Sequence, residues 1–269
     1  MAALSTSSLE SLNRLSQINS VLSLTARKLS SGQRITKAAD DAAGLGIAKA
    51  IEAELSGLSQ ASRNVNDGVS LAQVAEGGLS NIQNQLSRLN ELTVAASNGA
   101  LSPTQREALN TEANAIIEEV NRQASTLEFN GQKLLDGSLA GGVSVQVGTQ
   151  AGDTLSVSVA DSRAAALGLS SDNLLTQGGA QSFLSSVQDA IGAVSARRST
   201  LGASQNSLNS AGNNLRSTTE SLASARSQIA DADFAAESAN LVKAQILQKS
   251  AVGVLGQVAG FDRSLLKLV

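Results

Sequence analysis

Residues 184–229, LSSVQDAIGAVSARRSTLGASQNSLNSAGNNLRSTTESLASARSQI, decide the fold. Steps of alternately three and four residues stay on one helix face along this stretch, a spacing typical of helices that supercoil against partner helices. At 1.5 Å per residue the predicted rod is roughly 70 Å long. The large aliphatic positions of its seam, spaced by seven from Val194 onward, are Leu201, Leu208, Leu215, Leu222 and Ile229.

The alternate positions of this seam are polar or small, so the helix cannot bury itself alone. They hold Arg198, Gln205, Gly212, Thr219 and Arg226. We expect the aliphatic residues to close on the chain's own helices, and the polar ones to face polar parts of the bundle or adjacent subunits. The sequence therefore predicts a rod that is completed by other helices, from this chain or from neighbouring copies.

Composition excludes several classes of function. The 269 residues include no His and no Cys, which excludes imidazole acid–base chemistry, cysteine nucleophiles, thiolate metal sites and disulfides. The net charge of −3 gives no field for nucleic-acid binding, and no apolar run approaches the ~20 residues that span a membrane. Aromatic residues are 1% of the chain, which suits helix packing better than sheet stacking. We expect no nucleic-acid partner, no membrane partner and no cofactor.

Charged residues offer few candidates for catalysis. Asp40-Asp41 and Asp231 with Asp233 stand where helices are predicted to begin, and acids there satisfy free backbone N–H groups and the helix dipole. The basic residues within 14–37 fit either a solvated face or an electrostatic contact with the acidic remainder. No histidine is present to activate a serine, and the glycine-rich tracts lack a phosphate-binding pattern. An enzyme is therefore not expected, and neither is a metal site.

Both ends of the chain are predicted to be helices with 3-4 apolar spacing. The first covers residues 5–31, with Ser7 and Glu10 as a capping box and Gly32 as its end. The last covers residues 234–258. Helices of this length with weak seams are marginal alone, so we expect them to pair with each other and with other copies. Their seam positions are Leu12, Leu15, Leu22, Leu29, Leu241, Leu255 and Val258.

Two further helices are predicted between the terminal ones. Residues 40–98 have one apolar side and end at Asn98-Gly99. Ser102 as N-cap, Pro103 at the first position and Gln105 at the third then start the next helix with a capping box. Glycines inside the longer helix indicate either the close approach of a neighbouring helix or a break. These glycines are Gly57, Gly68, Gly77 and Gly78.

Strand patterning is confined to residues 143–159. Two alternating segments flank a turn at 148–154, which predicts one hairpin with one apolar face lying on the helices. Residues 129–137 are predicted to be a turn-rich connector, and 161–182 an irregular segment. The predicted fold class is mainly α, a long antiparallel helical coiled-coil bundle with one small β-hairpin.

Several motifs resemble those of bacterial flagellin, in the order typical of that family. Residues 29–35 (LSSGQRI) and 39–45 (ADDAAGL) resemble its N-terminal signature, which residues 64–68 (NVNDG) continue. Residues 129–137 (FNGQKLLDG) resemble the connector before the family's hairpin, and 229–237 (IADADFAAE) resemble its C-terminal signature. The resemblance runs from end to end, without the variable outer domain that many flagellins insert after the hairpin.

This resemblance implies a structural subunit that polymerises into the extracellular flagellar filament for motility. It implies that residues 1–40 and 232–269 pair as the inner layer (D0), and that 41–231 form the surrounding rod bundle with the hairpin near 143–159 (D1). The polymer would be an open helical homopolymer. Export through the flagellar type III apparatus, an export chaperone and a filament cap are the implied partners. Export without a cleaved signal peptide agrees with Glu10, which interrupts the first apolar run.

Three residues stand where flagellins carry a surface that a host receptor recognises. Arg88, Leu92 and Glu112 match that pattern, so the resemblance implies the flagellin-sensing Toll-like receptor as a further partner, although filament contacts alone also explain these residues. Three other functions stay open: a hook–filament junction protein, a surface adhesin or innate-immune ligand, and an intracellular coiled-coil scaffold. The full motif set and the hairpin connector favour the filament subunit.

Overall fold

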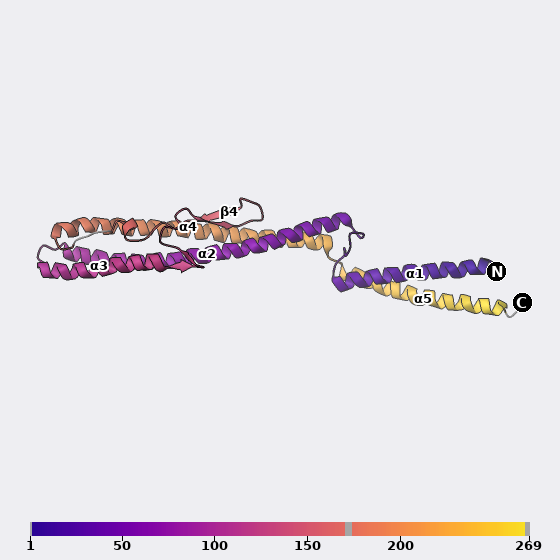
Figure 1. Cartoon of the computed structure of the whole chain (residues 1–269). Coiled ribbons are helices and arrows are strands. Elements are labelled where there is room, and N and C mark those ends of the chain that lie inside the picture. Colours follow the sequence, from indigo (N-terminus) through magenta and orange to yellow (C-terminus); the bar gives the residue numbers. More distant parts are fainter. Residues whose placement is uncertain (1, 170–173, 267–269) are drawn as a thin grey trace. The chain divides into compact units, whose positions relative to one another are not determined.

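The structure, a computed structural model, describes residues 2–169 and 174–266. The chain forms two compact units: unit 1 (Met1–Leu55 with Glu220–Val269) and unit 2 (Ser56–Thr219). Two long helices, α2 (Ala42–Ala96) and α4 (Gln177–Ala230), contribute residues to both units (Figure 1). The division between the units therefore falls inside helices, whereas the resemblance implies a D0–D1 boundary in the turns that precede α2 and follow α4.

Unit 1 contains two antiparallel helices that pack against each other, α1 (Ala2–Ser31) and α5 (Phe234–Leu266) (Figure 1). Gly32 ends α1 in the left-handed region, with φ +68°, as predicted. The predicted cap at Ser7 is wrong, because the helix already begins at Ala2. Alanine and leucine precede Ser7 and are strong helix formers, so the helix continues through them. Helix α5 likewise continues past Val258, where the apolar spacing ends.

Unit 2 contains α3 (Pro103–Thr126) beside its parts of α2 and α4 (Figure 1). The predicted capping box is confirmed, because the Gln105 N–H donates to Ser102 Oγ at 3.3 Å and the Ser102 N–H donates to Gln105 Oε1 at 2.9 Å. The predicted rod is confirmed as one continuous helix that starts earlier than expected. Its start is set by Thr176, whose Oγ1 accepts a hydrogen bond from the Gly179 N–H at 3.0 Å.

The predicted hairpin is confirmed as β3 (Val143–Gln146) and β4 (Thr154–Val157). The strands are antiparallel, with Val145 opposite Leu155. Val145 is 8% exposed and its Cγ2 lies 3.1 Å from the position that a Cβ would take at Gly68 of α2. The apolar face of the hairpin therefore lies on the helical bundle, which stabilises a pair of strands that would be marginal in isolation.

A second small sheet lies in the segment that the sequence predicted to be a turn-rich connector. Its strands are β1 (Glu128–Phe129) and β2 (Gln132–Lys133), paired antiparallel. Asn130, with φ +50°, and Gly131, with φ +77°, form the two-residue loop between them. An Asn-Gly pair in this conformation is typical of tight hairpins. The strands are so short that no alternation of apolar and polar residues marks them, and the prediction of a single hairpin is corrected.

Three of the four glycines predicted inside α2, Gly57, Gly68 and Gly78, are sites of close approach, and the helix is continuous through all four. A Cβ at Gly57 would lie 2.8 Å from Thr149 Cγ2 of the β3–β4 turn, and a Cβ at Gly78 would lie 2.9 Å from Leu135 Cδ1. At Gly77 a Cβ would meet nothing within 4 Å. The hairpin therefore approaches α2 at Gly57, and Leu135 of the connector approaches it at Gly78. The predicted approach of a neighbouring helix is confirmed at Gly68, where Leu208 Cδ1 of α4 lies 3.3 Å from the position of a Cβ.

Unit 2 has a continuous apolar core between its three α-helices. Side chains from the connecting segments also enter it, among them Leu134, Leu135, Leu169 and Leu174, each 1% exposed or less. This core positions the long faces of α2, α3 and α4. The large side chains from the helices that are buried almost completely are Leu79, Ile82, Leu86, Leu89, Val120, Phe183, Leu201 and Leu208.

Candidate assembly surfaces

The seam of α4 faces inward at its aliphatic positions in unit 2. Leu201, Leu208 and Leu215 are 1%, 0% and 7% exposed. Its polar and small alternate positions are half-buried. Leu222 and Ile229, which continue the same seam in unit 1, are also half-buried. The seam is therefore closed within unit 2 and only partly closed in unit 1.

Arg198 shows how one polar position of the seam is accommodated. Its Nε donates to Glu76 Oε1 at 2.8 Å, and its Nη1 donates to Gln83 Oε1 at 2.6 Å. The predicted contact with a polar part of the bundle is confirmed for this residue. The second carboxylate oxygen of Glu76 is buried and has no hydrogen-bond partner. The Glu76 carboxylate therefore relies on Arg198 for its hydrogen bonds.

The predicted seam residues of α1 and α5 are less buried than those of α4. Leu12 is 52% exposed, and six others are half-buried. Polar contacts also join the two helices: the Gln248 Nε2 donates to Asn19 Oδ1 at 2.8 Å, and Lys28 Nζ lies 3.9 Å from Glu237 Oε1. The ion pair supports an electrostatic contact for one basic residue of the first helix. The half-buried seam residues are Leu15, Leu22, Leu29, Leu241, Leu255 and Val258.

Exposed apolar side chains are concentrated in unit 1. Among the described residues, the large apolar side chains that are exposed lie in this unit, apart from Val94 and Leu175. Val242 and Ile246 are 52% and 59% exposed and line one shallow, mainly apolar groove on α5. Exposed apolar surface of this extent favours contact with other protein. The side chains concerned in unit 1 are Leu9, Leu12, Val21, Ile47, Phe234, Val242, Ile246, Leu247, Val252 and Val254.

Within unit 1, the turn after α1 is joined to the end of α4 by backbone hydrogen bonds. The Arg34 N–H donates to Ala230 O at 2.7 Å, and the Ala232 N–H donates to Gly32 O at 2.9 Å. The Arg34 guanidinium adds a bond from Nη2 to Ile229 O at 2.6 Å. Sequence reasoning missed this role of Arg34, because its partners are backbone oxygens far away in the chain.

Two of the aspartates at the predicted helix starts, Asp41 and Asp233, are caps. Asp41 Oδ1 accepts a hydrogen bond from the Gly44 N–H at 2.8 Å, and Asp233 Oδ1 accepts from the Ala235 N–H at 2.9 Å. Asp40 closes the turn before α2, and the hydrogen bond from the Thr36 hydroxyl lowers its pKa below the usual 3.8. These partners satisfy backbone and hydroxyl donors, so the carboxylates have structural roles.

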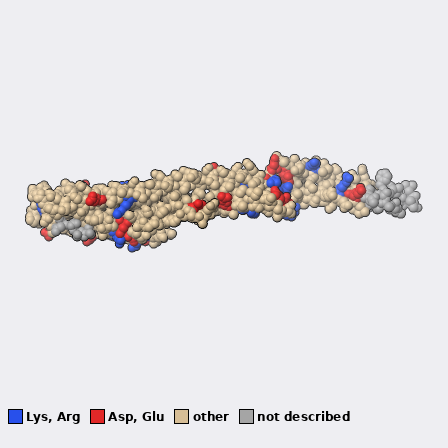
Figure 2. All heavy atoms as spheres, turned by 90° about the horizontal axis from the view of Figure 1, so that it is seen from above, with Lys and Arg blue, Asp and Glu red and all other residues tan. Residues whose placement is uncertain are grey.

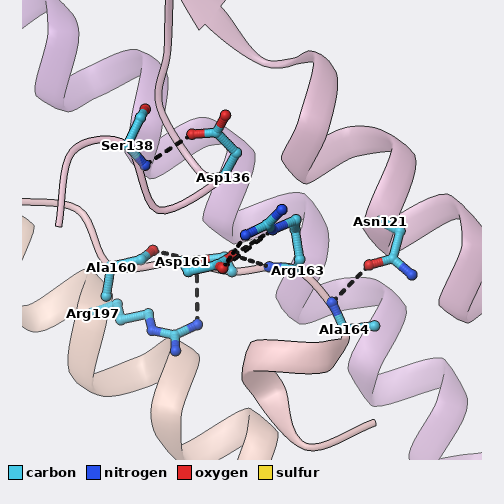
Figure 3. A network of polar contacts seen from close by, with 9 residues as sticks. Asn121, Asp136, Ser138, Ala160, Asp161, Arg163, Ala164 and Arg197 are labelled. Atoms are coloured by element: carbon cyan, nitrogen blue, oxygen red, sulfur yellow. Dashed lines mark hydrogen bonds and ion pairs between the residues drawn. The ribbon is translucent and has the colours of Figure 1, made fainter. Parts of the chain in front are cut away.

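The segment after β4 is held on α3 and α4 by the polar network in Figure 3. The Ala164 N–H donates to Asn121 Oδ1 of α3 at 2.9 Å, and Arg197 Nη1 of α4 donates to Ser162 Oγ at 3.3 Å. Ser162 is 0% exposed. No local pattern predicts these contacts, since they join positions that are distant in sequence.

Charges in this network are balanced over short distances (Figure 3). Arg163 Nη2 donates to Asp161 Oδ2 at 2.6 Å, and this contact lowers the pKa of the Asp161 carboxyl below 3.8. Burial lowers the pKa of the Arg197 guanidinium, and the nearby Asp161 charge opposes that effect. The network therefore stabilises a structural junction and contains no group of the kind that performs acid–base catalysis near neutral pH.

The three residues of the implied receptor surface differ in accessibility. Arg88 of α2 and Glu112 of α3 have exposed side chains, and Arg88 Nη2 lies 2.8 Å from Glu112 Oε1. Leu92 is only 4% exposed. The structure thus brings Arg88 and Glu112 together at the surface, and it places Leu92 in the core, where its contacts are with the bundle.

Other classes of site find no support in the part of the chain that the structure describes. Within residues 2–169 and 174–266, no acidic cluster of three or more residues could hold a metal ion, and no helix is long and apolar enough to cross a membrane. On the face in Figure 2, basic and acidic side chains lie close together in small clusters. Such alternation gives no extended field of one sign.

Comparisons with known proteins agree with this architecture. Residues 4–140 match the bacterial flagellin N-terminal helical region, and residues 184–269 match the bacterial flagellin C-terminal helical region. A flagellin from Halalkalibacterium halodurans is 38% identical over 90% of this chain and 89% of its own length. One from Xenorhabdus nematophila is 34% identical over 98% and 97%. The crystal structure of Bacillus cereus flagellin covers 57% of this chain and 88% of its own, with 27% identity and a TM-score of 0.52.

Proposed function

The chain belongs to the bacterial flagellin family and is a structural subunit of the extracellular flagellar filament, and we propose that unit 1 supplies its main contacts between copies. Members of this family polymerise with themselves and are not enzymes. The observation that carries the proposal is the concentration of exposed apolar side chains in unit 1, whereas the core of unit 2 is closed. Each such side chain gains about 1 kcal/mol when a neighbouring copy covers its exposed half.

The proposal assigns the two ends of the chain to the filament interior. Residues 1–40 and 232–269 form the inner layer, D0, and residues 41–231 form the surrounding layer, D1. The half-buried seams of α1 and α5 support this assignment, because a second helix pair on their open side would complete the burial. The assembly is a helical homopolymer in which each copy presents one surface and receives another.

Two matched substitutions test which unit joins the copies. Ile246→Asp in α5 and Val94→Asp in α2 each place a charge at an exposed apolar position, since the two residues are 59% and 53% exposed. We expect both variants to keep the thermal unfolding of the parent. Seeded polymerisation, followed by sedimentation and electron microscopy, should fail for Ile246→Asp and proceed for Val94→Asp. Polymerisation of Ile246→Asp at the parent's critical concentration would contradict the proposal.

Export through the flagellar type III apparatus is the second part of the proposal, with an export chaperone and a filament cap as partners. Membership of the family supports it. In a host strain that carries its own flagellar apparatus, the chain should appear in the medium and on the filament. Deletion of a structural gene of the export apparatus should keep the chain inside the cell. Secretion at the parent level in that deletion strain would refute this part.

Recognition by the flagellin-sensing Toll-like receptor is the third part. The exposed pair of Arg88 and Glu112 supports it, because both side chains present charge on the surface of unit 2. Leu92, which is buried, would contribute only by packing beneath this surface. In a receptor reporter assay, Arg88→Ala should lower signalling and Arg63→Ala, at an exposed arginine elsewhere on α2, should not. Equal signalling by the parent and Arg88→Ala would leave filament contacts as the only role.

A further inference from the structure

The apolar seam of α4 is nearly the same after a shift of seven residues. In unit 2 its large aliphatic positions that recur every seven residues and are buried are Val187, Val194, Leu201, Leu208 and Leu215. Leu208 packs on Gly68 of α2, with its Cδ1 3.3 Å from the position of a Cβ there. If α4 slid along α2 by one heptad, Leu201 or Leu215 would take the same place. Burial of these aliphatic positions alone therefore distinguishes the registers weakly.

One polar cluster in the seam does distinguish them. Arg198 bonds both Glu76, at 2.8 Å, and Gln83, at 2.6 Å, and these two residues are one heptad apart on α2. A slide of α4 by one heptad would replace Arg198 with Ile191 or Gln205, neither of which carries a charge. Glu76, which has one buried oxygen without a partner already, would then keep its charge in a half-buried place with no cation.

We propose that the cluster of Arg198, Glu76 and Gln83 fixes the register of α4 against α2 in unit 2. Its role is to exclude heptad-shifted packings, as a single polar position does in a coiled coil. A slide of one heptad would displace α4 by roughly 10 Å along α2. A helical polymer requires equivalent copies, so a mixture of registers would also interrupt the proposed filament.

The absence of cysteine from the chain makes the register measurable. A Cβ at Gly212 would lie 3.4 Å from Val65 Cγ1 of α2, an ordinary contact, so the pair Val65→Cys with Gly212→Cys reports the native register. Two further pairs report slides of one heptad in the two directions: Val65→Cys with Gln205→Cys, and Val65→Cys with Thr219→Cys. Each full-length variant is refolded under reducing conditions and then oxidised. The disulfide yield is read on non-reducing gels and by mass spectrometry.

In the parent background we expect only the native pair to form a disulfide efficiently. When Glu76→Leu and Arg198→Leu are added together, the shifted pairs should gain roughly tenfold or more relative to the native pair, because the charge-assisted bonds that separate the registers are gone. The melting temperature should not fall, since a leucine pair replaces a partly buried ion pair. Arg216→Leu, which removes an exposed arginine from the same helix, is the control and should leave the ratio unchanged.

The exchanged pair Glu76→Arg with Arg198→Glu completes the test. It should restore a single register, because the opposite charges again face each other across the seam. If the leucine pair keeps only the native disulfide, packing sets the register and the proposal is wrong. If the leucine pair does not fold, the double variant Glu76→Gln with Arg198→Gln replaces it. Formation of the native disulfide alone in that variant would overturn the proposal. Shifted disulfides in the parent or in the exchanged pair would overturn it as well.

Discussion

Two leucine-to-alanine substitutions should separate the stability of the single chain from the stability of the filament. Leu208 is 0% exposed and packs over Gly68, which has no side chain to fill a cavity. Leu208→Ala should therefore cost about 3 kcal/mol of unfolding free energy in unit 2. For a unit of this size, that loss lowers the melting temperature by about 10 °C.

Leu12→Ala should have little effect on unfolding of the free chain and a larger effect on polymerisation. Leu12 is 52% exposed, so its truncation removes little buried surface from the free chain and costs about 1 kcal/mol or less. In the filament, a neighbouring copy would bury the exposed half, and the variant would lose about 1 kcal/mol of association free energy. That loss raises the critical concentration for polymerisation about fivefold.

The assay uses both variants in the same two measurements. Circular dichroism gives the melting temperature of the unpolymerised chain, and sedimentation after seeding gives the critical concentration. Two results would refute the reasoning: a fall in melting temperature for Leu12→Ala as large as that for Leu208→Ala, or an unchanged critical concentration for Leu12→Ala.

Three further predictions concern single residues. Gly77→Ala should raise the unfolding free energy by up to about 1 kcal/mol, because its new methyl group meets open space. Gly78→Ala should lower the unfolding free energy, because its methyl group would meet two leucine side chains. Urea denaturation of the two variants measures the sign of each change. Asp233→Ala should cost about 1 kcal/mol of helix α5 stability, visible as faster amide exchange in the first turn of α5, because the cap on that turn is lost. Arg163 holds the pKa of Asp161 below 3.8, so the charged carboxylate stabilises the fold above that pH, and the contribution is lost as pH falls through the lowered value. The difference in unfolding free energy between the parent and Asp161→Asn should therefore be present at neutral pH and vanish in strong acid; a difference that stays constant would show that Asp161 acts without its charge.

Long elements of this fold could be predicted because their determinants are local and repeated. The seven-residue spacing predicts α4 without reference to any partner, and the Ser102–Gln105 box starts α3 with contacts inside four residues. The β3–β4 hairpin could also be predicted, since alternation over two segments marks one apolar face. In each case the pattern that predicts the element is also the pattern that stabilises it.

Other features depend on contacts that no local pattern contains. Arg106 is 6% exposed and donates from Nη2 to Asn98 O at 2.6 Å, so it caps the end of α2 from another helix. Asn121 and Arg197 hold the segment after β4 in the same manner, from α3 and α4. Arginine and asparagine are common on exposed helix faces, and only the packed bundle distinguishes these residues from solvated ones.

The receptor surface shows that a match of residue types at corresponding positions does not predict the exposure of each side chain. Arg88, Leu92 and Glu112 fit one motif, but a motif match carries no information about exposure. Leu92 follows Arg88 by four residues on α2, and yet the helix turns it towards the core, with 4% exposure. A partner that docks on this face would meet the ion pair of Arg88 and Glu112 before any apolar atom of Leu92.

The contrast between the two units distinguishes a part of the chain that closes its own core from a part that we expect other copies to complete. Unit 2 buries its aliphatic seam within the chain, so its free energy of folding does not depend on neighbours. The α1–α5 pair has half-buried seams and exposed apolar faces, and a long helix pair of this kind gains much of its burial only when other copies cover it. We therefore expect the ordering of unit 1 to be coupled to association through the same surfaces. A chain that closed both units internally would fold well but would leave no apolar surface to drive polymerisation.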